Sequence, residues 1–356
     1  MNTRYATLYI QVFFMLYSSG LWANNSCEDT AIWRKWTNGE YHGANVMLNL
    51  NKTDWDILRN SWHVNSVRLQ LILKDDQLQL LSKGGLDALP RLRGKLKLFF
   101  ESADNAKIDV IVDLHRVEGG AVGDKAKLWK SPQLRENYKK VWAILAKELK
   151  QYPNLAGFDL LNEPTPVGVY TKAYYQRKGT DEDWMVLAKS VLDEIRKHNS
   201  CVPIIIESVD WAKPFRFNEM VVFDDERVVY SAHMYSPISF THQGINQFPK
   251  GFKLDDALVN GNRLNDYVKT GMKEVRKFQC KYHKPIYIGE FGVNFYADSD
   301  ERIKYINTLI DVFSEYGWSW SYHAYQIWEG WMPSSATLET IARSAKRTKT
   351  IKVECK

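Results

Sequence analysis

Short apolar runs alternate with amphipathic stretches along most of the chain. Ile108–Leu114 and Ile204–Ile206 are rich in branched apolar residues, which is typical of parallel strands that are buried on both faces. In Ser131–Gln151, Trp184–Lys197 and Arg302–Tyr316, apolar residues return every three or four positions, and this spacing predicts helices. The pattern predicts eight strands: Gly43–Leu48, Ser66–Leu71, Ile108–Leu114, Gly157–Leu161, Pro203–Val209, Val228–His233, Pro285–Gly289 and Gly317–Ala324.

Eight strand–helix repeats within one chain predict an α/β fold of the (β/α)8 TIM-barrel type, with a doubly wound parallel sheet as the alternative. No segment rich in Pro and Ser, and no block of like charge, interrupts the repeats. We therefore expect residues 24–356 to form a single domain.

The first 23 residues have the order of a secretory signal peptide. A positive start at Met1–Arg4 precedes the apolar stretch Leu8–Tyr17, and small residues lead to Ala23. The apolar stretch contains Gln11 and is too short to span a bilayer. We expect cleavage after Ala23 and a secreted or periplasmic protein without a membrane span.

The four cysteines of the expected mature chain are an even number, which suits disulfides in an oxidising compartment. Cys201 and Cys280 each precede a predicted strand, and Cys27 and Cys355 lie near the termini. Four cysteines can form two disulfides in three ways, and this placement favours the pairs Cys201–Cys280 and Cys27–Cys355. No cysteine has the spacing of a zinc site, so we expect no bound metal.

The composition of the chain limits the classes of molecule that we expect the protein to bind. The 356 residues carry 48 Lys and Arg against 42 Asp and Glu, a net charge of only +6 without a basic stripe interleaved with aromatics. We therefore expect no nucleic-acid partner. Aromatic residues make up 13% of the chain, and flat rings with polar tips suit both sugar-stacking surfaces and large cores. We expect a monomer.

The barrel hypothesis places functional groups at the carboxyl ends of the strands, where the loops gather at one mouth. Polar residues end five of the predicted strands: Arg68, His115, Glu163, His233 with Tyr235, and Glu290. Two of them are carboxylic acids, which is the minimum set for cleaving a glycosidic bond through an oxocarbenium-like transition state. No cofactor is needed for this chemistry.

Glu163 and Glu290 follow the fourth and seventh predicted strands, on opposite sides of a closed barrel mouth. Arg68 is always cationic and holds a neighbouring carboxylate ionised, as a nucleophile requires. The other carboxyl, with fewer cations near it, keeps its proton and acts as the acid. Asn162 offers an amide to a sugar hydroxyl, and the histidines and Tyr235 orient the substrate or tune the carboxyls.

The residues at five strand ends, in their order along the chain, resemble those of glycoside hydrolase family 5. The motifs that show this resemblance are Gly157-Phe-Asp-Leu-Leu-Asn-Glu-Pro164, Ile288-Gly-Glu-Phe-Gly292, Val112-Asp-Leu-His115, Val67-Arg68 and His233-Met-Tyr235. The resemblance implies a retaining (β/α)8 hydrolase of β-linked polysaccharides. It further implies that Glu163 is the acid/base and Glu290 the nucleophile, with Arg68, His115, Asn162, His233 and Tyr235 around the substrate.

The eighth strand departs from the family pattern, in which a Trp forms the floor under the sugar. Trp320 is the expected floor residue, although a shifted register would put His323 there. Trp211, after the fifth strand, and Trp328, after the eighth, are further candidates for stacking a sugar, with core packing as the alternative for Trp211.

The sequence thus predicts a retaining β-glycosidase, expected to be an endo-β-1,4-glucanase (a cellulase) acting on a β-linked oligo- or polysaccharide. A β-1,4-mannanase, or a hydrolase of another β-glucan or glycoconjugate, is the nearest alternative. A carbohydrate-binding barrel without catalysis and a metal-dependent barrel hydrolase are rivals from other classes. A pure binder needs neither Glu163 nor Glu290, and the chain lacks an HExxH spacing.

Overall fold

A computed structural model describes Cys27, residues 30–122, 126–166, 168, 171–254 and 263–345, and Cys355. The predicted signal peptide over residues 1–23 lies outside these residues. Within them, no helix is long and apolar enough to cross a membrane.

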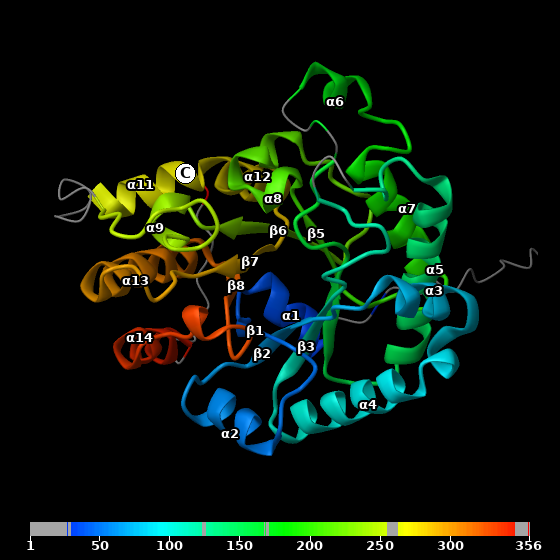
Figure 1. The fold of residues 1–356 in the computed structure, drawn as a ribbon, viewed down its shortest axis with the longest axis horizontal. Helices are drawn as coiled ribbons and strands as arrows, with labels where there is room; N and C mark the ends of the chain where they lie inside the picture. Colours follow the sequence, from blue (N-terminus) through cyan, green and yellow to red (C-terminus); the bar gives the residue numbers. More distant parts are fainter. Residues whose placement is uncertain are drawn as a thin grey trace, which may run out of the picture.

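Eight parallel strands close into a barrel in sequence order, with β8 pairing back onto β1 (Figure 1). This confirms the predicted (β/α)8 fold. The strands are β1 (His42–Val46), β2 (Ser66–Gln70), β3 (Asp109–Asp113), β4 (Leu155–Asp159), β5 (Ile204–Glu207), β6 (Val228–Met234), β7 (Ile286–Phe291) and β8 (Ser319–Tyr322).

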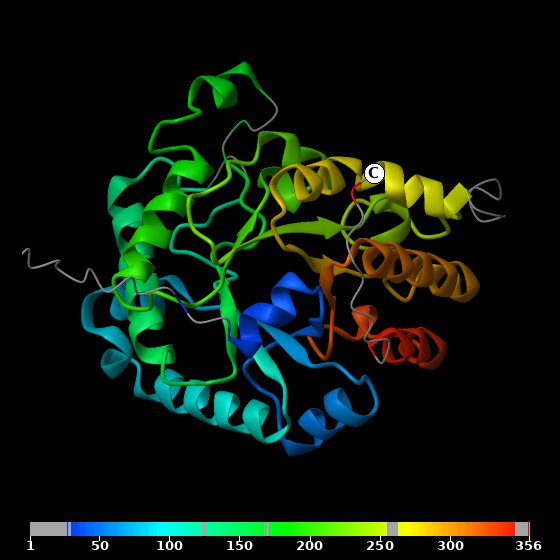
Figure 2. The ribbon, with the colours of Figure 1, turned by 180° about the vertical axis from the view of Figure 1, so that it is seen from behind.

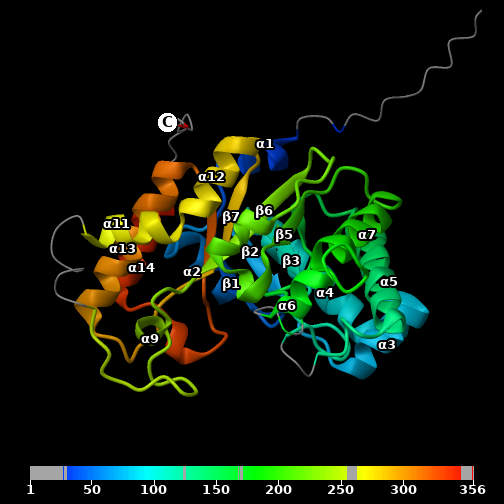
Figure 3. The same ribbon diagram turned by 90° about the horizontal axis from the view of Figure 1, so that it is seen from above.

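Helices surround the strands, and α1 lies across one end of the barrel (Figure 2). Seen from above, α1 and the loop helices α6 and α9 lie toward opposite ends of the molecule (Figure 3). The helices are α1 (Ala31–Thr37), α2 (Lys52–Asn60), α3 (Asp75–Gly84), α4 (Pro90–Asn105), α5 (Pro132–Leu149), α6 (Lys172–Gln176), α7 (Trp184–Arg196), α8 (Val209–Ala212), α9 (Ile238–Thr241), α11 (Arg263–Gly271), α12 (Lys273–Tyr282), α13 (Ser299–Tyr316) and α14 (Ser335–Ala345), with 3₁₀ turns at Gly85–Ala88, Pro214–Glu219 and Glu329–Trp331.

Local sequence fixes where several of these helices begin and end. Asn51 and Asp54 form a reciprocal capping box at the start of α2. Ser131 caps α5 through its hydroxyl, and Pro132 follows at the first helical position, where its missing N–H costs nothing. Gly317 ends α13 with a φ of 65°, a left-handed conformation that glycine adopts without steric cost.

Two apolar clusters make up the core. The larger one lies between the strands and the helix layer and includes Trp142, Trp184 and Phe313. The smaller one fills the barrel below the mouth and includes Trp36, Ile111 and Tyr287. Because the lower barrel is filled by side chains, polar groups at the strand ends face a cavity closed from below.

Two disulfides are present, and the pairing predicted from the sequence is wrong. The bonds join Cys27 to Cys201 and Cys280 to Cys355. The Trp36 indole of α1 donates to the Ala156 carbonyl of β4 at 2.8 Å. The amino-terminal segment therefore enters beside β4 and β5, where Cys201 lies, and each terminus pairs with its own neighbouring connection rather than with the other terminus.

Candidate active site

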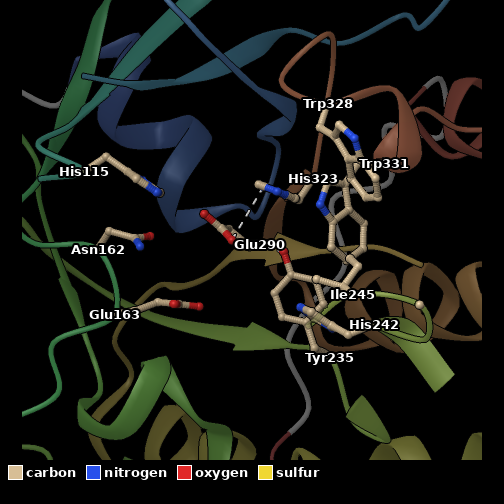
Figure 4. A pocket seen from close by; sticks show the side chains of 11 residues that line it. His115, Asn162, Glu163, Tyr235, His242, Ile245, Glu290, His323, Trp328 and Trp331 are labelled. Carbon is tan, nitrogen blue, oxygen red and sulfur yellow. Dashed lines mark hydrogen bonds and ion pairs between the residues drawn. The ribbon is translucent and has the colours of Figure 1, made fainter. Parts of the chain in front are cut away.

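A cavity of about 510 Å³ opens at the carboxyl ends of the strands. In Figure 4, His115, Asn162 and Glu163 face Glu290 from one side, and His323 and Tyr235 flank it on the other. The lining residues are His115, Asn162, Glu163, Tyr235, His242, Gly244, Ile245, Glu290, His323, Trp328 and Trp331. Both predicted carboxyl groups therefore reach the same cavity.

Glu290, in β7, is held by three donors. One oxygen accepts from Arg68 Nη1 at 2.8 Å and from Gln70 Nε2 at 3.1 Å. The other accepts from the Tyr235 hydroxyl at 3.0 Å. The side chain is only 6% exposed, so these bonds fix its rotamer and favour its ionised form.

Arg68, in β2, is fully buried and pairs with four carboxylates. Besides Glu290, its guanidinium lies 2.8 Å from Asp159, 2.9 Å from Glu207 and 3.1 Å from Asp113. One planar cation therefore orients acids from β3, β4, β5 and β7 below the cavity.

Glu163 follows β4 in a left-handed conformation, with a φ of 49°. Its backbone N–H donates to Glu207 Oε2 at 2.6 Å, which holds this unusual backbone in place. Among the described residues, His233 is the one donor that bonds its carboxyl group, with Nδ1 3.0 Å from Oε1. Glu163 thus has fewer stabilising donors than Glu290.

The two glutamates lie close together. One carboxylate oxygen of Glu163, one ring nitrogen of His233 and one carboxylate oxygen of Glu290 lie within 4.8 Å of one another. Retaining glycosidases hold their carboxyl groups about 5–5.5 Å apart, whereas inverting enzymes leave about 6.5–9.5 Å for a water molecule. The spacing is therefore that of a retaining pair.

The surroundings drive the two pKa values in opposite directions. Burial alone would raise the pKa of Glu290, but the positive charges of neighbouring histidines and Arg68 hold it well below its usual range. Burial raises the pKa of Glu163, and the negative charge of Glu290 adds to the rise against the hydrogen bond from His233. The surroundings therefore favour the ionised form of Glu290 and the protonated form of Glu163.

His233, in β6, connects the pair to Glu207. Its Nε2 lies 3.0 Å from Glu207 Oε1, and its Nδ1 lies 3.8 Å from Glu290 Oε2. Burial would lower the pKa of His233, but the charges of Glu207 and Glu290 and the bonds to Glu163 and Glu207 raise it well above its usual value. His233 is therefore a cation that faces both candidate catalytic groups.

The other predicted polar residues also lie at the mouth. His115 Nδ1 lies 2.6 Å from Asp113, whose charge raises the pKa of the histidine against the effect of burial. The Asn162 oxygen accepts from Arg68 Nη2 at 3.1 Å. Because Arg68 occupies this oxygen, the amide nitrogen of Asn162 is the group available to a substrate hydroxyl.

The prediction that Trp320 forms the floor under the sugar needs correction. This side chain is fully buried and stacks on His42, with ring centroids 4.9 Å apart. Ser321, the next residue of β8, accepts a hydrogen bond from Tyr287 inside the barrel. Because strand side chains alternate, Trp320 points outward into the helix layer. His323 lines the cavity instead, with Nδ1 3.6 Å from Glu290 Oε2.

His323 brings an imidazole to the position expected for a flat indole. Burial lowers the pKa of His323 to about 4, so the ring is neutral near pH 7. Its Nδ1 lies 3.5 Å from Gln70 Nε2, and its ring meets Trp331 edge-on at 5.3 Å. The floor of the cavity beside Glu290 is therefore polar, with the aromatic surface set to one side.

The two remaining tryptophan predictions have different outcomes. Trp328 lines the cavity and is 41% exposed. Trp211 is 46% exposed but is not part of the cavity lining. Its backbone N–H donates to the Thr165 hydroxyl at 3.1 Å, which places Trp211 beside the loop that follows Glu163.

Sequence reasoning missed Gln70 and several loop residues. Gln70 ends β2 two positions after Arg68, so strand alternation alone would have put it on the same face. His242 and Ile245 lie in the loop after β6, where no strand pattern indicates which side chains turn inward. Only the folded loop reveals these two.

Among the described residues, Glu163, His233 and Glu290 are the one group with three potential metal-ligand atoms close together. A histidine must be neutral to bind a metal. Both ring nitrogens of His233 face carboxylates, which keep it protonated. The cluster therefore favours proton transfer over metal binding.

Comparison with known proteins agrees with this geometry. The family model described as cellulase (glycosyl hydrolase family 5) matches residues 24–329. Endoglucanase C of Acetivibrio thermocellus is 24% identical over 286 residues, which cover 71% of this chain and 77% of that protein. Cellodextrinase A of Ruminococcus flavefaciens is 23% identical over 242 residues, covering 66% and 68%.

Solved structures share the fold. An endoglucanase superposes with a TM-score of 0.68 at 22% identity, covering 88% of this chain and 99% of that one. The Cel5A structure of Thermotoga maritima in complex with mannotriose gives a TM-score of 0.67 at 20% identity, covering 86% and 99%.

Proposed function

The chain belongs to glycosyl hydrolase family 5, and from this membership we propose that the protein cleaves β-1,4-linked glucan at internal bonds of the polymer. In this proposal Glu163 is the acid/base and Glu290 is the nucleophile. The family and its endoglucanase relatives make the protein a cellulase-type retaining glycoside hydrolase. The assignment of the two glutamates rests on one observation above all. Two carboxyl oxygens lie within 4.8 Å of each other in surroundings that favour opposite protonation states.

In the first step, the Glu290 carboxylate attacks the anomeric carbon while Glu163 donates its proton to the departing glycosidic oxygen. A covalent glycosyl ester forms on Glu290, and the leaving sugar departs with the proton. Glu290 loses its charge in the ester, so the main anion that raised the pKa of Glu163 disappears. Glu163, now a carboxylate, takes a proton from a water molecule as the water oxygen attacks the anomeric carbon. The bond from that carbon to Glu290 breaks, Glu290 leaves as a carboxylate, and the sugar is released with its configuration retained.

The neighbouring residues support both steps. Tyr235 and Arg68 hold Glu290 in position for attack. His233 faces both carboxyl groups as a cation, so it stabilises the negative charge as that charge passes from Glu290 to Glu163. Asn162 is placed to bind a hydroxyl beside the reacting carbon, and His115 borders the same space.

The substrate proposal follows the relatives. Several of them are endoglucanases and one is a cellodextrinase, so β-1,4-glucan is the first choice. β-1,4-Mannan is the second, because a protein of the same fold has been solved with mannotriose. Trp328 and Trp331 offer an aromatic wall, and the neutral His323 offers a hydrogen-bonding floor, to the sugars in either chain.

The protein is also proposed to work outside the cytoplasm. Two disulfides suit an oxidising compartment, and the first 23 residues read as a signal peptide. Residues 24–356 are proposed to form one catalytic domain that acts as a monomer.

A substrate panel tests the proposed function. Reducing sugar released from carboxymethylcellulose, mixed-linkage glucan, xyloglucan and mannan is measured for the wild type and for Glu290→Gln. We expect the highest rate on a β-1,4-glucan and a loss of at least about a thousandfold in the variant. A wild type that binds these polymers without cleaving any of them would support the binding-barrel alternative instead.

A further inference from the structure

Gln70 is a polar side chain at the mouth that neither step of the proposed reaction uses. It ends β2 two positions after Arg68, on the same face of the strand, and is only 2% exposed. Burial of an amide costs free energy unless its hydrogen bonds are made inside the protein. The partners of this amide therefore indicate its role.

The neighbours of Gln70 determine which end of its amide faces Glu290. Asn45 donates from Nδ2 to the Gly289 carbonyl at 2.9 Å. Its oxygen, Oδ1, is therefore the atom that accepts from Arg68 Nη1 at 3.0 Å. Gln70 Nε2 lies 3.3 Å from this oxygen and 3.1 Å from Glu290 Oε1. Because both neighbours are acceptors, the nitrogen of the Gln70 amide must face them, and Gln70 is a donor to Glu290.

The two oxygens of Glu290 have different surroundings. Oε1 accepts from Gln70 and from the fully buried Arg68. Oε2 lies 3.8 Å from His233 Nδ1, and the same ring nitrogen lies 3.0 Å from the Glu163 carboxyl. Oε2 is therefore the oxygen on the side of the acid, and in the proposed reaction it attacks the anomeric carbon. Oε1 then becomes the carbonyl oxygen of the glycosyl ester.

Gln70 is committed to one carboxylate, unlike the other donor to Oε1. Among the described residues, Glu290 is the one carboxylate that accepts from Gln70. The guanidinium of Arg68 is shared with three further carboxylates within 3.1 Å, those of Asp113, Asp159 and Glu207. The bond from Gln70 therefore depends on the charge of Glu290 alone.

The negative charge on Oε1 changes during the reaction. It falls when Oε2 bonds to the sugar and returns when that bond breaks, because an ester carbonyl carries less charge than a carboxylate. A hydrogen bond to a charged acceptor is stronger than one to a neutral acceptor. The bond from Gln70 therefore stabilises the free carboxylate more than the ester, and it favours breakdown of the ester over its formation.

From this geometry we propose that Gln70 is a further catalytic residue, which speeds release of the sugar from Glu290 by donating a hydrogen bond to the oxygen that does not attack. In that step the water oxygen bonds to the anomeric carbon, and a proton of the water passes to Glu163. The bond from the carbon to Oε2 breaks, and its electron pair returns to the carboxylate whose Oε1 accepts from Gln70. This inference rests on the proposed function of Glu163 and Glu290.

A fluorinated glycosyl fluoride measures the two steps separately. 2-Deoxy-2-fluoro-β-cellobiosyl fluoride inactivates the enzyme at the rate of ester formation, and the labelled enzyme, freed of reagent, recovers at the rate of ester breakdown. Both rate constants are measured for the wild type and for Gln70→Met, which has a similar length and no amide donor. We expect reactivation to slow at least about fivefold and inactivation to slow less than about twofold.

The matched control is Gln79→Met. Gln79 lies on α3 and donates to the Glu118 carboxylate at 2.7 Å, and neither residue lines the cavity. The control loses the same kind of hydrogen bond and should keep both rate constants. Gln70→Leu is a second test variant with a different shape. Reactivation is a first-order rate constant of folded, labelled enzyme, so it does not depend on how much of a variant folds.

Steady-state kinetics give an independent readout. With an aryl β-cellobioside whose phenol leaves readily, ester breakdown limits kcat. We expect kcat and KM of Gln70→Met to fall together by at least about fivefold, which leaves kcat/KM within about twofold of the wild type. A purely structural role for Gln70 would lower kcat/KM as far as kcat, and that result would overturn the inference.

The outcomes of the labelling experiment separate this inference from the proposed function. Reactivation at the wild-type rate in both Gln70 variants, or equal slowing of both steps, would overturn the role of Gln70 even if the enzyme remained a normal glucanase. A wild type that forms no ester on Glu290 would overturn the proposed function and, with it, this inference.

Discussion

Glu163 and Glu290 have the same side chain, so the different roles proposed for them depend on their neighbours. Glu290 accepts from Arg68, Gln70 and Tyr235, all of which favour its charged form. Glu163 has one donor, His233, among the described residues and lies beside the charge of Glu290. The number of donors that each carboxyl group meets therefore supports the proposal of Glu290 as the nucleophile and Glu163 as the acid.

Removal of Glu163 should affect substrates according to their leaving groups. Glu163→Ala should slow hydrolysis of β-glucan by about 10²–10⁴-fold, because a sugar alkoxide leaves poorly without a proton. Aryl glycosides with acidic phenols need no such proton, so formation of their ester intermediate should slow far less. Pre-steady-state release of phenols of graded acidity measures the difference. Equal losses across the series would contradict an acid role.

Removal of the Glu207 charge should shift the pH dependence. Glu207→Gln keeps an acceptor for the Glu163 backbone but takes away the anion that raises the pKa of His233. His233 then carries less positive charge at a given pH, so the pKa of Glu290 rises. For Glu163, the loss of the Glu207 charge, which raised its pKa, offsets the weaker charge of His233, which lowered it. Activity grows as Glu290 ionises and declines as Glu163 ionises. The acid limb of the pH profile of kcat/KM should therefore move to higher pH, and the alkaline limb should move less.

The control for this shift is Glu148→Gln, which changes a carboxylate on α5 that pairs with Arg93. Its profile should match the wild type, and Glu207→Asp should restore part of the original profile. A Glu207→Gln enzyme with lower activity but unmoved limbs would mean that Glu207 acts only in folding.

At the scale of elements, strands were easier to predict than the loops between them. Each predicted strand overlaps an observed one, because buried parallel strands require short apolar runs. Strand ends were equally informative, since a closed barrel brings them all to one mouth, and Arg68, His115, Asn162, Glu163 and Glu290 do meet there. Loops follow no such period, so His242 and Ile245 carried no signal before the fold was known.

The eighth strand shows the limit of this reasoning. Gly317–Ala324 was correctly predicted as a strand, but alternating residues leave two registers open, and the choice decides whether Trp320 faces the sugar or the helices. Ser319 and Ser321 are the inward residues: the Ser319 hydroxyl accepts from the Tyr41 backbone N–H, and the Ser321 hydroxyl accepts from the Tyr287 hydroxyl. Packing within the barrel, which a single strand does not encode, selects the register.

Two tryptophan substitutions test this register. Trp320→Ala should destabilise the protein by about 3–5 kcal/mol, because it empties a fully buried site. Trp328→Ala removes a 41% exposed ring from the cavity wall, so it should raise KM for glucan with a stability loss of only about 1 kcal/mol or less. Chemical denaturation and kinetics measure the two effects. The reverse pattern would place Trp320 under the sugar.

At the scale of the whole molecule, the termini are fastened by the disulfides. The bond between Cys280 and Cys355 closes a sequence separation of 75 residues and fastens the chain end to α12. Peptide mapping without reduction should recover Cys27 linked to Cys201, and Cys280 linked to Cys355. Cys280→Ser/Cys355→Ser should lose about 2–4 kcal/mol of unfolding free energy through the freer unfolded chain. A recovered Cys27–Cys355 peptide would contradict this arrangement.

The barrel as a whole serves to bring two distant glutamates together. Glu163 follows β4 and Glu290 lies in β7, and closure of the sheet places their oxygens within reach of one sugar. The sequence predicted this meeting from topology alone. The distance between the two glutamates and the opposite shifts of their pKa values depend on side chains of β2, β5 and β6, which topology alone does not place.

Covalent trapping tests the central assignment most directly. The enzyme is incubated with 2-deoxy-2-fluoro-β-cellobiosyl fluoride, digested, and mapped by mass spectrometry. The fluorine slows hydrolysis of the glycosyl ester, so the intermediate should accumulate on the peptide that contains Glu290. A sugar attached to any other residue, or turnover of the reagent with inversion and no attached sugar, would contradict the assignment of Glu290 as the nucleophile.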